Sequence, residues 1–198
     1  MASVQRLYHR QGAGRPARVR WALEEAGATY EYVVMDKEEG RGPEHVKRHP
    51  LGRVPVLETD DGPLFESAAL CIHVADSHPD AHLIPPPGTH DRALVYQWAF
   101  FAMTELEPAV LRLWTARRGD DPEELTMAET RLGRVAAAIE HALEGRDYLV
   151  ADSFTVADII LGGVLESARH YEVFPDSAPL QAYLERLDAR PAKQRAYA

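Results

Sequence analysis

Cysteine and long apolar runs are the two features that this sequence lacks most clearly. Cys71 is the only cysteine in 198 residues, which excludes an internal disulfide and favours a reducing compartment. The opening MASVQRLYHRQ has no apolar signal core, and no apolar stretch approaches the length that spans a membrane. We therefore expect a cytoplasmic protein that is not attached to a membrane.

Basic residues are also scarce relative to acidic ones. The chain has 22 Lys and Arg against 31 Asp and Glu, a net charge of -9. An acidic surface repels phosphate backbones, and Arg15, Arg18 and Arg20 alternate with apolar residues rather than forming a basic patch. We do not expect a nucleic acid as partner. The 45% hydrophobic and 27% charged residues are typical of a globular protein.

The composition changes near residue 80. Before it, short segments alternate between strand and helix patterns, whereas everything after it has helical periodicity. The segment SHPDAHLIPPPGTH (77–90) contains three consecutive prolines, which neither a helix nor a central strand tolerates. We predict a first domain over 1–79, a linker over 80–90 and an all-helical domain over 91–198.

The first part predicts the element order βαβαββα. The helix over 14–27 has apolar residues at helical spacing and ends at Gly27, and Asp60-Asp61-Gly62 indicates a hairpin. A parallel first strand pair followed by a terminal hairpin is typical of a thioredoxin-like α/β sandwich. The predicted elements are strands over 3–9 and 29–35, a short polar helix within 42–50, the hairpin strands and a helix over 67–77.

The second part predicts a helical bundle. A long helix over 91–117 should bend or break at Pro108. A further helix should end at Gly145, and a last helical region over 178–197 should be interrupted at Pro191. Between them, Thr155 and Asp158 have the spacing of a helix-capping box.

Five motifs in order resemble the cytosolic glutathione transferase superfamily over the full length, and most of all its bacterial branch. They are RVRWALEEAG (18–27), HPLGRVPVL (49–57), FESAA (65–69), FTVADI (154–159) and ARPAKQRA (189–196). His49 replaces the usual Asn of the second motif. The resemblance implies a thioredoxin-like domain followed by an all-α domain, glutathione as co-substrate, a homodimer, and no metal or tightly bound cofactor.

The resemblance gives Val54 and Pro55 a role in holding glutathione. Local sequence alone favours a trans Pro55 at the start of a strand, because cis is the minority form. In the family this bond is cis, and the backbone of the preceding residue pairs with the tripeptide. We carry that role to Val54, and Arg53 is a further candidate for a carboxylate contact.

Glu66 and Ser67 stand where a helix begins. Free backbone N–H groups at a helix start bind carboxylates, and a serine hydroxyl adds a donor. The same pair also suits an ordinary helix cap. The resemblance implies that Glu66 and Ser67 bind the γ-glutamyl group. We call Arg53, Val54, Pro55, Glu66 and Ser67 the cradle.

The group that would stabilise the glutathione thiolate is harder to assign. Related bacterial enzymes carry Ser-Arg-Ser before the first helix, whereas this chain has Gly14-Arg15-Pro16. The remaining candidates for stabilising the thiolate are Tyr8, Arg15 and Gln11. The alternative is that Tyr8 is only a core residue and Arg15 only a surface charge. The loop has no cysteine, which disfavours thiol transfer, and Cys71 is expected to be buried within a helix.

Two further groups of side chains allow a functional and a structural interpretation. Phe101 and Trp114 could line a hydrophobic substrate pocket, although aromatic residues at helical spacing also form cores. His45 and His49 lie one helical turn apart and could bind a metal. Because a third ligand is missing, we expect them on a solvated helix face.

The main hypothesis is a glutathione S-transferase that conjugates glutathione to a small hydrophobic electrophile. The alternative is a non-catalytic protein of the same fold that binds glutathione or a partner, which the missing serine favours. A glutathione-dependent isomerase would need an SSCS loop, which this chain lacks.

Overall fold

The computed structural model describes residues 4–10, 14–36 and 38–198, whose contacts divide the chain into two units. The first unit comprises Met1–Ile84 and Pro191–Ala198, and the second comprises Pro85–Arg190. The predicted helical domain included 191–198, so the units differ from it at this end. The reason is that α9 (Pro191–Tyr197) packs on α1 (Gly14–Glu25) through buried residues such as Ala192 and Ala196.

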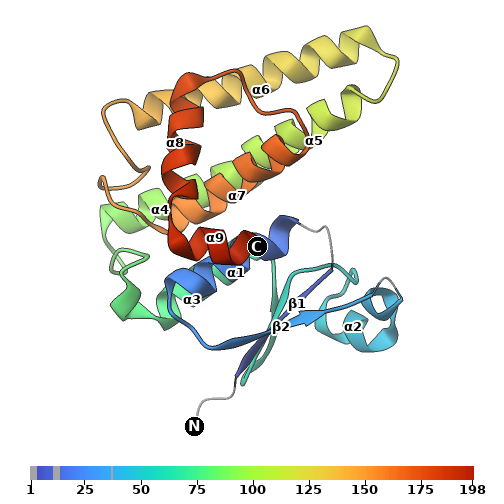
Figure 1. Ribbon diagram of the computed structural model, residues 1–198, viewed down its shortest axis with the longest axis vertical. Helices are drawn as coiled ribbons and strands as arrows, with labels where there is room; N and C mark the ends of the chain where they lie inside the picture. Colours follow the sequence, from blue (N-terminus) through green and yellow to red (C-terminus); the bar gives the residue numbers. More distant parts are fainter. Residues whose placement is uncertain (1–3, 11–13, 37) are drawn as a thin grey trace. The chain divides into compact units, whose positions relative to one another are not determined.

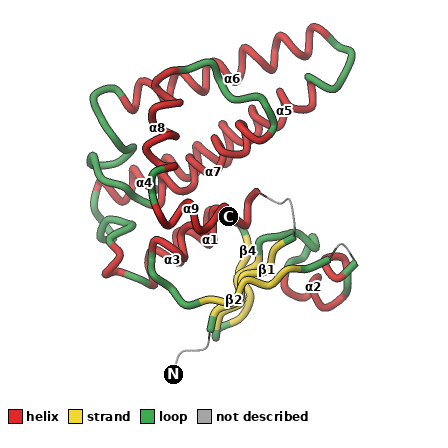
Figure 2. Tube along the Cα trace, viewed as in Figure 1, coloured by secondary structure: helices red, strands yellow, loops and turns green. Residues whose placement is uncertain are grey.

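The first unit is built on a four-stranded sheet with the strand order β2-β1-β3-β4 (Figures 1 and 2). Strands β1 and β2 are parallel and the other neighbours are antiparallel. This confirms the predicted order βαβαββα, and Asp60 and Asp61 form the hairpin loop. The elements are β1 (Gln5–His9), β2 (Tyr30–Val34), η1 (Glu39–Arg41), α2 (Pro43–Arg48), β3 (Val56–Thr59), β4 (Gly62–Phe65), α3 (Ser67–Ser77) and η2 (Pro79–Ala81).

The two faces of the sheet are covered by different helices. Successive residues of a strand point to opposite faces, so Leu7 and Tyr8 separate the two sides. Fully buried Leu7 faces the side of α1 and α3, whereas Tyr8 lies under α2, with the Arg48 guanidinium 4.6 Å from its ring centroid (Figure 1). Tyr8 packs there in a small cluster with Met35, Val54 and Val56. The first residues of the cradle therefore rest on the α2 side.

The second unit is entirely helical among the residues described, as predicted. The expected break near Pro108 begins earlier, because the chain forms a π-helical turn at η3 (Ala102–Leu106). Pro108 then lies in the first turn of α5, directly after this π-helical turn. The other elements are α4 (His90–Phe101), α5 (Glu107–Ala116), α6 (Pro122–Leu143), α7 (Val156–His170) and α8 (Ala178–Asp188).

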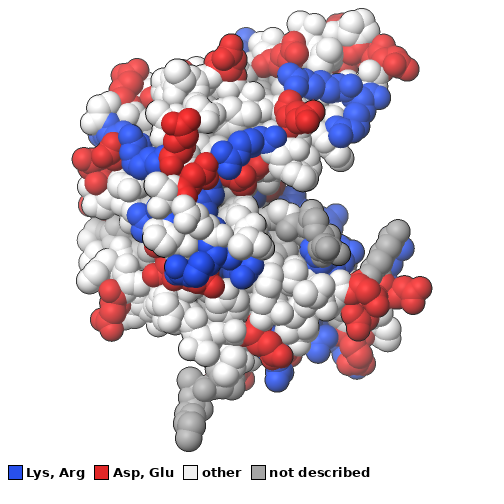
Figure 3. Space-filling view, viewed as in Figure 1, with Lys and Arg blue, Asp and Glu red and all other residues white. Residues whose placement is uncertain are grey.

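Charged side chains of both signs are mixed on the surface (Figure 3). On the face drawn in Figure 3, Lys and Arg side chains lie among Asp and Glu side chains. None of the helices formed by the described residues combines the length and the apolar character needed to cross a membrane.

Candidate functional site

The backbone of Val54 offers one edge of the cradle. The Val54–Pro55 bond is cis, which confirms the expectation from the family resemblance. The Val54 side chain is buried in the cluster with Tyr8, Met35 and Val56, and this packing holds the residue in place. No hydrogen bond joins its N–H or carbonyl to another described residue, since the β1–β3 pairing ends at Val56. These two groups are the kind that an extended peptide can use.

The turn before Val54 is fixed by two histidines. The Nδ1 atom of His49 accepts a hydrogen bond from the Leu51 N–H at 3.1 Å, much as the Asn usual at this position would. The Gly52 N–H donates to the His49 carbonyl at 2.8 Å, and Gly52 has φ +58. The Nε2 atom of His45 lies 2.8 Å from the Arg53 carbonyl oxygen. Arg53 itself is exposed.

The expectation that His45 and His49 lie on a solvated face is wrong. Their exposed fractions are 1% and 5%, because α2 turns both rings toward the sheet. The ring of His49 contacts Phe65 at 4.8 Å between centroids, and that of His45 lies 6.5 Å from Tyr8. The part of the chain that the structure describes contains no group of three potential metal ligands.

The start of α3 forms the other edge of the cradle. Glu66 precedes the helix with φ 71, a backbone conformation that costs a non-glycine residue about 1–3 kcal/mol. Its exposed side chain makes no capping hydrogen bond to the helix. Ser67 follows and is buried, with an exposed fraction of 2%. The helix thus starts at a strained residue and lacks a cap from that residue's side chain.

A buried arginine stands beside this helix start, and sequence reasoning did not single it out. Arg18 of α1 is fully buried, and its Nη1 atom lies 3.5 Å from the Ser67 hydroxyl oxygen. A guanidinium adds positive potential at a helix end that already favours anions. The signal in the sequence was a charged residue at a position that the helical pattern assigns to the buried face of α1.

Cys71 has the inert character expected of it. It is fully buried in α3, and its Sγ atom lies 3.5 Å from the Arg18 carbonyl oxygen. Burial raises the pKa of its thiol to about 12. Since thiolates are the reactive form, this cysteine is not a nucleophile in this environment.

The hydroxyl of Tyr8 is already bound. It donates to the Oε2 atom of Glu58 at 2.7 Å, on the α2 side of the sheet. Burial and then this bond raise the pKa of Tyr8, and the same bond is the main cause of the lowered pKa of Glu58. Arg15 lies in the first turn of α1. Gln11 falls outside the described residues.

The two predicted pocket aromatics lie in the second unit. Phe101, at the end of α4, packs edge-on against Trp98 with 5.2 Å between centroids. Trp114 of α5 lies between the Arg118 guanidinium, at 4.1 Å, and Tyr171, at 4.9 Å. Both are partly exposed. Their role in a substrate pocket stays a prediction.

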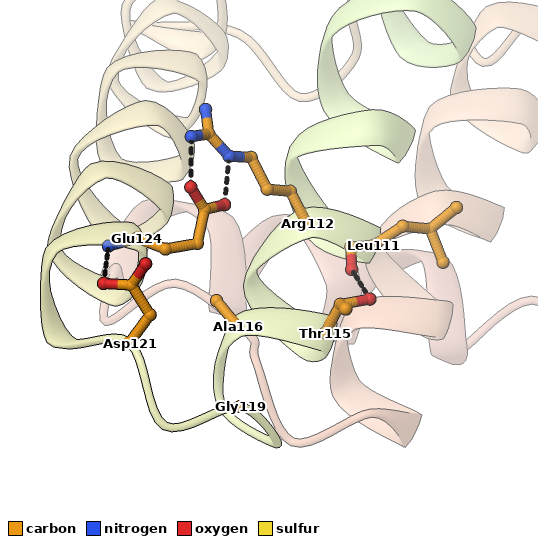
Figure 4. A pocket seen from close by; sticks show the side chains of 7 residues that line it. All are labelled: Leu111, Arg112, Thr115, Ala116, Gly119, Asp121 and Glu124. Atoms are coloured by element: carbon orange, nitrogen blue, oxygen red, sulfur yellow. Dashed lines mark hydrogen bonds and ion pairs between the residues drawn. The ribbon is translucent and has the colours of Figure 1, made fainter.

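A separate surface cavity of about 430 Å³ lies between α5 and α6. Its polar groups satisfy one another, since Arg112 binds Glu124 through two hydrogen bonds of 2.7 and 2.8 Å (Figure 4). Asp121 caps α6, and Thr115 donates to the carbonyl of its own helix at Leu111 (Figure 4). None of the predicted site residues that the structure describes lines this cavity.

Comparison with known proteins agrees with this geometry. The family model described as glutathione S-transferase, N-terminal domain, matches residues 3–76, and that of the C-terminal domain matches residues 93–191. The chain belongs to the glutathione S-transferase family. Its fold is accordingly the thioredoxin-like domain and helical domain of that family, as the sequence predicted.

The similar proteins include glutathione transferases and an elongation factor subunit. Glutathione S-transferase 4 of Zea mays is 31% identical over 188 residues, which cover 89% of this chain and 84% of that protein. Elongation factor 1-gamma 1 of Oryza sativa is 36% identical over 124 residues, covering 60% of this chain but 29% of that protein. The structure of glutathione transferase URE2P8 from Phanerochaete chrysosporium with oxidized glutathione is 27% identical, with a TM-score of 0.85 over 98% of this chain and 93% of that one.

Proposed function

We propose that the protein is a glutathione S-transferase that conjugates glutathione to a small hydrophobic electrophile. The observation that carries the proposal is the open start of α3, where Glu66 is strained and Ser67 lies beside the buried Arg18. The γ-glutamyl carboxylate would bind the first amides of α3 and the Ser67 hydroxyl. Glu66 would bind the ammonium group, and the Val54 backbone, before Pro55, would pair with the cysteinyl unit.

The thiolate would be stabilised near the start of α1. A free thiol has a pKa of about 8.5, and each unit of depression requires about 1.4 kcal/mol of preferential stabilisation. Arg15 and the helix dipole supply positive potential there. Tyr8 can contribute only after its single O–H has left Glu58, because one hydroxyl donates one hydrogen bond. Arg53 would contact a carboxylate of the tripeptide.

The remaining partners follow the family. Phe101 and Trp114 would contact the apolar electrophile. The proposal also includes a homodimer, as the family resemblance implies. We propose that the protein works in the reducing cytoplasm. The proposal involves no nucleic acid, no membrane and no tightly bound cofactor.

A second candidate function is non-catalytic binding of glutathione or of a protein partner. Three observations favour it. The hydroxyl of Tyr8 is engaged by Glu58, and elongation factor 1-gamma, whose matched region is 29% of its length, is among the relatives. The loop before α1 also lacks the serine of the bacterial enzymes.

Calorimetric titration with reduced glutathione, followed by a conjugation assay with an aromatic electrophile, separates the two candidates. We expect binding and turnover for the transferase. Binding without turnover supports the non-catalytic protein. If millimolar glutathione produces no heat of binding and does not compete with another ligand, both glutathione-based proposals are contradicted.

A further inference from the structure

His45 is a buried residue of α2 with one bound and one unbound nitrogen. Its Nε2 atom lies 2.8 Å from the Arg53 carbonyl oxygen, which can only accept a hydrogen bond. Nε2 must therefore carry the proton. The Nδ1 atom is buried and has no hydrogen-bond partner among the described residues. His45 therefore donates to the Arg53 carbonyl through Nε2.

Packing alone does not explain an imidazole at this position. A buried acceptor without a partner destabilises the folded state, and an apolar ring of similar size would fill the space without that cost. Unlike an apolar ring, the imidazole supplies an N–H group, which Nε2 donates to the Arg53 carbonyl. Sites that break a packing rule in this way are expected where function requires it.

The bond from His45 is the last restraint on the chain before Val54. His49 holds the Leu51 amide, and Gly52 packs tightly, since a Cβ atom there would lie 3.0 Å from the Gly40 carbonyl oxygen. These contacts fix the turn up to Gly52. Beyond it, the Arg53 carbonyl is fixed by His45, and the adjoining Val54 backbone has no partner of its own. Because the Arg53 carbonyl and the Val54 N–H belong to one planar peptide group, this hydrogen bond helps to orient the Val54 N–H, together with the buried Val54 side chain and the start of β3 at Val56.

We infer that His45 is a positioning residue of the cradle, which orients the Val54 backbone toward glutathione through the Arg53 carbonyl. The inference rests on the proposed function. His45 has 1% of its surface exposed, so it acts through Arg53 and does not contact the tripeptide.

Two variants of His45 separate the N–H group from the ring. His45→Phe keeps a planar ring and removes the donor, whereas His45→Gln keeps an N–H near the position of Nε2. We expect His45→Phe to raise the Kd and KM for glutathione about tenfold, with kcat within about twofold, and His45→Gln to restore both constants to within about threefold. The control is Val46→Ala, an exposed neighbour on the same helix, which should leave all constants unchanged.

Each outcome bears on a different part of the inference. Unchanged affinity in His45→Phe, with binding by the wild type, overturns the role of His45 alone. Weak binding by both variants assigns the effect to packing and also overturns it. No binding by the wild type overturns the proposed function, and the inference with it.

A measurement on the wild type keeps the inference testable if His45→Phe does not fold. A long-range ¹H–¹⁵N correlation spectrum should show that the Nε2 atom of the His45 imidazole carries a proton. Protonation at Nδ1 instead would exclude the bond to Arg53 and overturn the inference.

Discussion

Two helix starts in this molecule have opposite hydrogen-bonding arrangements. At α7, the Thr155 side chain accepts from the Ala157 N–H, and Asp158 accepts from the Thr155 N–H at 2.8 Å. Asp158 is fully buried and also accepts from Leu149 and Tyr183. At α3, the preceding Glu66 has φ 71 and its side chain caps nothing.

The difference shows which helix start serves the fold and which is available to a ligand. Side chains of the second unit satisfy the donors at the start of α7, so an anion there has little to bind. At α3 the positive end of the helix lies beside Arg18 and Ser67, and the preceding Glu66 has a strained backbone conformation. Removing side chains at α7 should therefore change stability, whereas changes at α3 should alter ligand binding.

The largest expected effect is that of Asp158→Ala. It leaves buried donors at Leu149, Thr155 and Tyr183 without a partner, which should lower the free energy of unfolding by about 3–5 kcal/mol. Chemical denaturation followed by circular dichroism measures it. The folded fraction should bind glutathione as the wild type does.

The matched control is Asp176→Ala, which removes an exposed carboxylate from the same unit. It should change the unfolding free energy by less than about 0.5 kcal/mol. A loss of similar size in both variants would contradict the structural role assigned to the α7 start.

Sequence patterns predicted most of the fold because its signals are local. The Asp60-Asp61 hairpin, the end of α1 at Gly27 and the Thr155–Asp158 box each depend on a few neighbouring residues. The assignment of 191–198 to the first unit was missed, because it depends on packing against a helix far away in the sequence.

The site was predicted less completely, because side-chain direction is set by tertiary contacts. The helix start and the family resemblance singled out Glu66 and Ser67 as candidates, but neither could show that the Tyr8 hydroxyl donates to Glu58 on the α2 side. The burial of His45 was predicted wrongly for the same reason. A short polar helix does not reveal which of its faces packs on a sheet.

The second largest effect is expected for Ser67→Ala, at the open helix start. A hydrogen bond to a charged carboxylate contributes about 1.5–3 kcal/mol, so the Kd for glutathione should rise about tenfold to a hundredfold. Calorimetry measures it. Ser153→Ala, an exposed serine of the second unit, serves as control, and an equal Kd for both variants would remove Ser67 from the cradle.

Tyr8→Phe tests whether the residue belongs to the fold or to catalysis. Loss of the bond to Glu58 should cost about 1 kcal/mol of stability at neutral pH. Because this bond lowers the pKa of Glu58 below its ordinary 4.5, ionised Glu58 stabilises the fold above that pH. This stabilisation is lost as the pH falls through the lowered pKa of Glu58 in the folded protein. The difference in unfolding free energy between the wild type and Tyr8→Phe should therefore become smaller in that pH range.

Kinetics on the same variant decide the catalytic question. An unchanged pH profile of turnover would remove Tyr8 from the mechanism. A fall in kcat with an unchanged KM for glutathione would show that the hydroxyl leaves Glu58 during catalysis.

The smallest expected effect, that of Glu66→Gly, tests the comparison of the two helix starts most directly. Glycine adopts φ 71 without strain, although it gains entropy in the unfolded chain, so we expect a net stabilisation of about 0.5–1 kcal/mol. Glutathione binding should weaken, because the carboxylate that would bind the ammonium group is gone. Glu66→Ala loses the same carboxylate but keeps the strain, and should bind as weakly without being stabilised. If both variants were equally stable, the backbone conformation of Glu66 would not cost the folded protein any free energy. The two helix starts would then differ only in their side-chain caps.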